Sequence, residues 1–77
     1  MARVESFVKV NRTAGYRLHP TAVVCGVEIY EVGGKRLVQL DTYGGEDRDI
    51  PGKVSQTLQL DEAAAGQLVK ILQGAFS

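Results

Sequence analysis

The stretch "TAVVCGVEIYEVGGKRLVQLDTY", residues 21–43, decides the fold. Its first half is rich in β-branched side chains and alternates in polarity, a pattern typical of a strand with one buried face. Gly33-Gly34 follows, and a Gly-Gly pair between two strand patterns predicts a tight hairpin because both central turn residues need positive φ. Residues 35–43 form the return strand. The inward side chains are expected to be Val23, Cys25, Val27, Ile29, Val38, Leu40 and Thr42.

The flanking sequence adds two more strands and a helix. Residues 4–11 and residues 55–60 each alternate apolar and polar side chains, which predicts a first and a fourth strand. Asp61 is a good N-cap, and residues 62–76 carry one apolar stripe at helical spacing. The chain is therefore expected to be a single α+β domain over residues 1–77. Its four-stranded antiparallel sheet is followed by one C-terminal helix (β-β-β-β-α).

The expected core lies between the sheet and this helix. A domain of 77 residues buries only about 60 % of the surface of its unfolded chain, so a homodimer would help to stabilise it. The helix stretch Ala63–Gly66 consists of small residues that suit close approach of a second helix. The residues predicted to be buried are Val8, Val10, Val27, Ile29, Val38, Leu40, Leu58, Leu60, Leu68, Val69 and Leu72.

Composition and charge restrict the class of protein. The formal net charge is zero, which argues against a domain held to nucleic acid by bulk charge alone. The charges are unevenly spread, with six basic and three acidic residues through Leu40 and the reverse from Asp41 onward. The single cysteine excludes an internal disulfide, and neither a signal peptide nor a membrane-spanning run is visible. The expected location is the cytoplasm, with no membrane partner.

The long loop after Tyr43, "GGEDRDIPGKV", superficially suggests phosphate or cation binding. A P-loop needs four residues between its glycines and a hydroxyl after the lysine, whereas six residues separate Gly45 from Gly52 and Val54 replaces the hydroxyl. The acidic residues Glu46, Asp47 and Asp49 match no calcium-loop spacing. A solvated polar loop is the favoured interpretation.

Cys25 and His19 are the remaining candidates for catalysis. A catalytic thiolate must be exposed and lie within reach of a base, but Cys25 is in phase with Val27 and Ile29 on the expected core face. His19 precedes Pro20 and is more typical of a turn, and without another histidine no zinc set is plausible. The sequence predicts neither an enzyme nor a metal or cofactor site.

The solvent face of the sheet is the best candidate for function. Tyr30, Gln39 and Tyr43, with Lys9, Asn11 and Gln56, are expected to be displayed there together. Aromatic rings that stack on bases, surrounded by amide and basic side chains, are typical of single-stranded nucleic-acid binding. An ordinary solvated sheet face is an equally weighted alternative. The candidate nucleic-acid-binding residues are Lys9, Arg12, Tyr30, Arg36, Tyr43, Arg48 and Lys53.

Residues 38–72, "VQLDTYGGEDRDIPGKVSQTLQLDEAAAGQLVKIL", resemble the single-stranded-DNA-binding family of the transcriptional coactivator called positive cofactor four and its bacterial and phage relatives. The shared pattern is a strand ending in an aromatic residue, an acidic loop, Pro-Gly-Lys, a short strand and an amphipathic helix. The resemblance implies a dimer that binds single strands with its sheets, acting in transcription or DNA processing with little sequence preference. A small protein-interaction module or phage regulator without nucleic-acid binding is the alternative.

Overall fold

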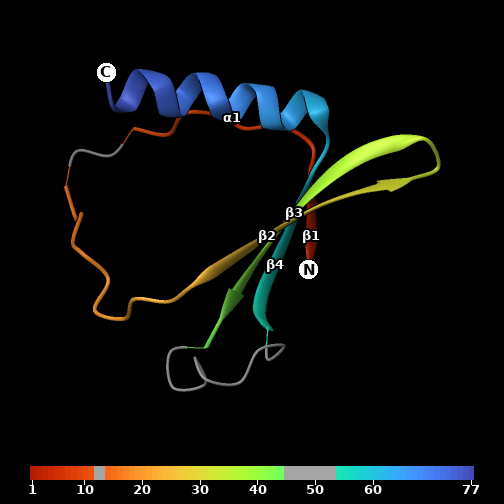
Figure 1. The fold of residues 1–77 in the computed structure, drawn as a ribbon. Helices are drawn as coiled ribbons and strands as arrows, with labels where there is room; N and C mark the ends of the chain where they lie inside the picture. Colours follow the sequence, from red (N-terminus) through yellow and green to blue (C-terminus); the bar gives the residue numbers. More distant parts are fainter. Residues whose placement is uncertain (12–13, 45–53) are drawn as a thin grey trace.

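The computed structural model of the chain describes residues 1–11, 14–44 and 54–77. The strands β1 (Ala2–Val4), β2 (Cys25–Val32), β3 (Lys35–Tyr43) and β4 (Val54–Leu60) form one sheet in the order β1-β4-β3-β2, and α1 (Glu62–Ala75) follows (Figure 1). The predicted α+β class and the order β-β-β-β-α are confirmed. No helix in the described ranges is long and apolar enough to cross a membrane.

The β2–β3 hairpin has the predicted turn. Gly33 and Gly34 have φ values of 58° and 80°, and the strands pair antiparallel from Val32↔Lys35 to Cys25↔Thr42. Because paired residues share a face, the registers define two surfaces. We call the first the apolar face: Ala2, Val4, Cys25, Val27, Ile29, Val38, Leu40, Thr42, Gln56, Leu58 and Leu60, with the charged pair Glu31 and Arg36 at its hairpin end. We call the second the polar face: Arg3, Gly26, Glu28, Tyr30, Val32, Lys35, Leu37, Gln39, Asp41, Tyr43, Val54, Thr57 and Gln59.

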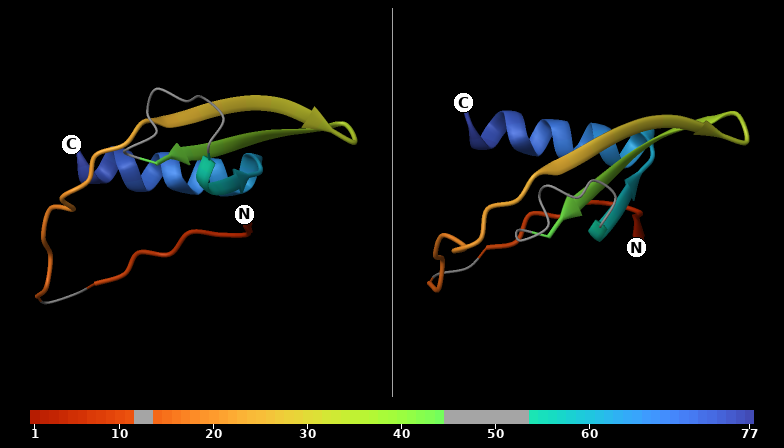
Figure 2. Two further views of the ribbon diagram at one scale, coloured as in Figure 1. Left: turned by 90° about the horizontal axis from the view of Figure 1, so that it is seen from below. Right: turned by 60° about the horizontal axis from the view of Figure 1, so that its bottom comes forward.

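The first strand differs from the prediction in both position and direction. It covers Ala2–Val4 instead of residues 4–11, and it pairs parallel to β4, so the sheet is mixed and not wholly antiparallel. The following residues leave the sheet and run beside α1 (Figures 1 and 2), where the Phe7 backbone N–H donates to Gln67 Oε1 at 2.8 Å. Alternating polarity fixes which side chains share a face, but it carries no information about the direction of pairing.

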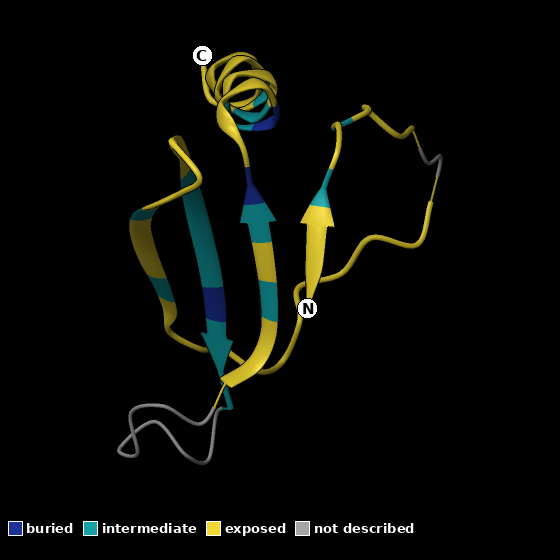
Figure 3. Cartoon of the chain, turned by 90° about the vertical axis from the view of Figure 1, so that its right-hand side faces the viewer, coloured by how far each residue is buried: buried dark blue, intermediate teal, exposed yellow. Residues whose placement is uncertain are grey.

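Much of the predicted core is exposed in the single chain. Of that set Leu60 is buried, Val38, Leu40 and Leu68 are half-buried, and the exposed members are Val8, Val10, Val27, Ile29, Leu58, Val69 and Leu72. The reason is the position of α1, which crosses the end of the sheet where β4 terminates and leaves most of the apolar face uncovered (Figure 3). Leu60 and Ala64 are the only buried hydrophobic residues in the described part of the chain.

The start of α1 was predicted correctly. Asp61 is extended, with φ −86° and ψ −179°, and its Oδ1 accepts the Ala64 backbone N–H at 2.8 Å. This bond satisfies one of the helix's first free N–H groups, and Glu62 places a negative charge in the first turn. The cap fixes the point at which the chain turns from β4 into α1.

Candidate functional site

The polar face carries a connected network of side chains over three strands. The Tyr30 hydroxyl on β2 donates to Gln39 Oε1 on β3 at 2.9 Å and accepts from Gln59 Nε2 on β4 at 2.8 Å. Gln59 Nε2 also lies 3.3 Å from Gln39 Oε1. Because neighbouring strands are about 4.8 Å apart, these bonds direct the Tyr30 side chain from β2 toward β3 and β4.

Asp41 is the most buried residue of the network. It is 5 % exposed, and its Oδ1 accepts the Thr57 hydroxyl at 2.6 Å. Gln39 Nε2 lies 3.2 Å from both carboxylate oxygens. A carboxylate buried this deeply needs such donors, because an unsatisfied buried charge is costly. The bonds also fix the Gln39 amide, so that its oxygen faces Tyr30 and its nitrogen faces Asp41.

Tyr43 lies across the sheet in the opposite direction, from β3 onto β2. A Cβ placed on Gly26 would be 3.0 Å from the Tyr43 hydroxyl oxygen and 3.3 Å from Cε2. The ring therefore occupies the space that any side chain at position 26 would take. Glycine at this position allows the ring to lie flat, and Tyr43 stays half-exposed. This is the reason why a glycine inside β2 is tolerated despite its conformational cost.

The two rings form neighbouring parts of one surface. The Tyr30 hydroxyl reaches the Gln39 position and the Tyr43 hydroxyl reaches Gly26, which pairs with Asp41. Positions 39 and 41 are successive on this face, about 7 Å apart along the strand. The result is an aromatic and amide platform, suited to a flat ligand.

The seven residues predicted to bind nucleic acid do not all converge on this platform. Tyr30 and Tyr43 lie on it together. Lys9 is beside the C-terminal half of α1, where it lines a surface hollow with Lys70 and Ile71. Arg36 shares the parity of Val38 and is on the apolar side. Arg12, Arg48 and Lys53 lie outside the described residues.

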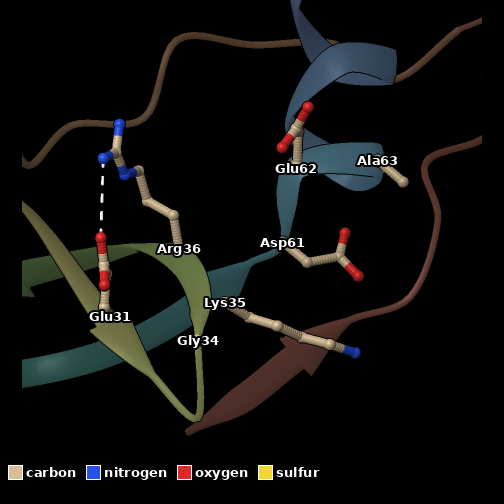
Figure 4. A pocket seen from close by; sticks show the side chains of 7 residues that line it. All are labelled: Glu31, Gly34, Lys35, Arg36, Asp61, Glu62 and Ala63. Carbon is tan, nitrogen blue, oxygen red and sulfur yellow. Dashed lines mark ion pairs between the residues drawn. The ribbon is translucent and has the colours of Figure 1, made fainter.

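Arg36 belongs to a hollow between the hairpin turn and the start of α1 (Figure 4). Its guanidinium is 3.6 Å from the Glu31 carboxylate, and both side chains are mostly exposed. Asp61 and Glu62 line the other side of the same hollow. These acidic neighbours make the hollow a poor place for a phosphate group.

Two other cations have the strand parity of the polar face. Arg3 pairs with Gln59 in the parallel register of β1, and Lys35 is in phase with Gln39 on β3. The Lys35 side chain also lines the same hollow as Arg36, beside Asp61 (Figure 4). Strand parity in the sequence could have assigned Lys35 to this face, whereas Arg3 required the unforeseen position of β1.

The structure also places three other residues that were singled out in the sequence. Gln56 pairs with Thr42 on the apolar face, as its parity with Leu58 requires, so it is not part of the platform. Cys25 is exposed instead of buried, because α1 begins after Leu60, at the opposite end of the apolar face. His19 Nδ1 accepts the Thr21 backbone N–H at 3.1 Å, in agreement with its prediction as a turn residue.

The site offers hydrogen-bonding groups and ring faces. Within residues 1–11, 14–44 and 54–77, no group of three or more His, Cys, Asp and Glu side chains is arranged to hold a metal ion. Comparison with known proteins gives no match to a family model, to a curated protein or to a solved structure.

Proposed function

We propose that the chain binds single-stranded nucleic acid, with little sequence preference, on the polar face of its sheet. The observation that carries the proposal is the pair of tyrosine rings laid along this face, Tyr30 across β3 and Tyr43 over Gly26. Flat aromatic surfaces stack on unpaired bases of any sequence, and each base–aromatic stack contributes about 1–3 kcal/mol. A base inside a duplex cannot offer its ring face, so the proposal includes a preference for single strands.

The remaining groups of the face suit the same ligand. The amides of Gln39 and Gln59 are held in place by Tyr30, so that little conformational entropy is lost when they contact a base edge. Arg3 and Lys35 have the strand parity of this face and are its proposed phosphate contacts. Arg12, Arg48 and Lys53 stay candidates on the basis of sequence alone.

The acidic residues of the face limit the electrostatic contribution. Glu28 is exposed on β2 opposite Gln39, and the chain has no net positive charge. Each phosphate neutralised on a single strand contributes about 0.7 to the slope of log K against log salt. With Arg3 and Lys35 as the main contacts, we expect a slope of about −1 to −2.

The proposal extends to the cellular role. Membership of the positive cofactor four-like family, with a role as a transcription or DNA-processing accessory, is predicted from the pattern of residues 38–72. A cytoplasmic location agrees with a single free thiol, which a reducing compartment preserves. We also propose that the chain acts as a homodimer.

Fluorescence anisotropy tests the proposed binding. A labelled single strand of about 20 nucleotides covers more than one site of the usual size, and its duplex form serves as the comparison. We expect micromolar or tighter binding to the single strand and weaker binding to the duplex. Tyr43→Leu should weaken single-strand binding about 5- to 150-fold, the equivalent of one stack.

Two results separate the alternatives. Absence of binding to the single strand at micromolar protein contradicts the function and favours the protein-interaction module. Equal affinity for single strand and duplex, or wild-type affinity of Tyr43→Leu, contradicts the stacking mechanism. Tyr16→Leu is the matched control, because Tyr16 is exposed in the segment between β1 and β2, outside the platform.

A further inference from the structure

The hydrogen bonds of the polar face run in a fixed direction, and Asp41 sets it. The carboxylate of Asp41 is buried and accepts hydrogen bonds, so the Gln39 amide turns its Nε2 toward the two carboxylate oxygens, at 3.2 Å from each. The reversed amide would place Gln39 Oε1 against those oxygens, with no hydrogen between them. Gln39 Oε1 therefore points away from Asp41, toward Tyr30 and Gln59.

This direction engages the only hydrogen of the Tyr30 hydroxyl. A phenol carries one O–H and two lone pairs. The Tyr30 O–H donates to Gln39 Oε1 at 2.9 Å, and one lone pair accepts from Gln59 Nε2 at 2.8 Å. The hydroxyl group can still offer a ligand its second lone pair but no hydrogen. Toward a bound base, Tyr30 is therefore an acceptor.

Gln59 is oriented by the same sequence of bonds. Because the Tyr30 hydrogen is engaged by Gln39, an oxygen of Gln59 would find no donor on this side, and Nε2 lies there instead. The carbonyl oxygen of Gln59 consequently faces away from Tyr30. In the described part of the chain every buried side-chain nitrogen or oxygen has a hydrogen-bond partner, and none is recorded for Gln59 Oε1, so this oxygen is open to solvent.

The two ends of this row of the sheet carry charges of opposite sign. Gln39 pairs with Gln59, and the row continues to Glu28 on β2 and to Arg3 on β1. Glu28 and Arg3 are both exposed. Arg3 suits a phosphate group, whereas the carboxylate of Glu28 adds further acceptors at the opposite end. The part of the row left for the bases is therefore rich in hydrogen-bond acceptors.

We infer that the platform selects bases that carry an exocyclic amino group. The inference rests on the proposed binding of single strands to this face and adds the chemistry of the base edge. Cytosine has an amino group where thymine and uracil have a carbonyl oxygen, and adenine and guanine also carry amino groups. An amino group donates to the oxygens of Tyr30 and Gln59, while a carbonyl oxygen in the same place meets their lone pairs. Since most sequences contain such bases, the preference is one of composition.

Two oligonucleotides that differ in this group test the inference on the native full chain. Labelled oligo(dC) and oligo(dU) of about 20 nucleotides have rings of the same size, so that stacking on the tyrosines is closely matched. Fluorescence anisotropy at mildly alkaline pH, where oligo(dC) stays single-stranded, should show about 2- to 12-fold tighter binding of oligo(dC), the equivalent of one net hydrogen bond.

Variants of the two acceptors assign the preference to this network. Tyr30→Phe keeps the ring and removes the hydroxyl, so the larger loss of affinity should be on oligo(dC), and the ratio of the two affinities should fall toward one. Gln59→Met removes the carbonyl from a side chain of similar length and should lower the ratio in the same way. Tyr16→Phe and Gln56→Met make the same changes outside the polar face and should leave the ratio at its native value.

The possible failures are distinguishable. Absence of binding to both oligonucleotides contradicts the proposed function, and this inference with it. Equal affinity for the two, or tighter binding of oligo(dU), overturns the selection and leaves single-strand binding in place. A native preference that Tyr30→Phe and Gln59→Met both retain in full overturns the assignment to this network. Circular dichroism establishes that the variants keep their helix, and the comparison on the native chain decides the preference even if a variant does not fold.

Discussion

Gly26→Val should displace the Tyr43 ring from the sheet and so weaken single-strand binding without unfolding the protein. Carbon atoms in contact are ordinarily about 3.5–4.0 Å apart, but a Cβ at position 26 would lie 3.3 Å from Tyr43 Cε2 and 3.0 Å from its hydroxyl oxygen. Alanine would require the ring to move by a few tenths of an ångström. The two further methyl groups of valine occupy the volume of the ring itself, so the flat position is lost.

The size of the effect follows from the stack that is removed. Loss of one base–aromatic stack costs about 1–3 kcal/mol, which raises Kd about 5- to 150-fold. Stability should change by less than about 1 kcal/mol, because a side chain at this position recovers about 0.5–1 kcal/mol of the backbone entropy cost of glycine while the ring loses its contact with the backbone.

Anisotropy and urea unfolding, measured on the same samples, separate these two effects. Gly26→Ala should give an intermediate loss of affinity. Gly74→Ala is the matched control, because a Cβ at position 74 meets nothing within 4 Å and α1 is remote from the platform. Wild-type affinity of Gly26→Val would show that the position of Tyr43 on Gly26 does not contribute to binding, and the stacking argument would then be wrong.

Three further substitutions test the elements that support the platform, each by urea unfolding followed by circular dichroism. Asp61→Ala removes the cap on the Ala64 N–H and should lower the free energy of unfolding by about 1 kcal/mol, whereas Asp61→Asn should retain most of it. Asp41→Asn keeps an oxygen for the Thr57 hydroxyl but places an amide N–H against the donor Gln39 Nε2, and should cost about 1–3 kcal/mol; a neutral result would show that the carboxylate is unnecessary. Gly34→Ala forces a side chain to φ 80° and should cost about 1–2 kcal/mol; an unchanged midpoint would mean that the turn can adopt another shape.

The parts of the fold that were predicted correctly depend on short-range rules. The Gly33-Gly34 hairpin and the Asp61 cap are decided by two to four neighbouring residues, and both are present. Strand parity likewise placed Tyr30 and Tyr43 on the same face as Gln39. These features need no knowledge of what lies beyond the strand itself.

The parts that were not predicted depend on long-range geometry. Residues 8 and 10 alternate like a strand, but the chain leaves the sheet after Val4 and runs beside α1. An alternating pattern shows that a strand has an apolar face, but it does not show whether the same chain covers that face. The exposure of Val27 and Ile29 was therefore not predicted. The network around Asp41 was missed because it requires the exact registers of β2, β3 and β4.

Amide chemical shifts recorded during titration with a single-stranded oligonucleotide test the central claim most directly, because they report which face of the sheet is contacted. We expect the largest changes at Tyr30, Gln39, Tyr43 and Gln59, with smaller changes at Val27 and Ile29. Largest changes on the apolar face, or no changes at all at saturating oligonucleotide, would contradict it.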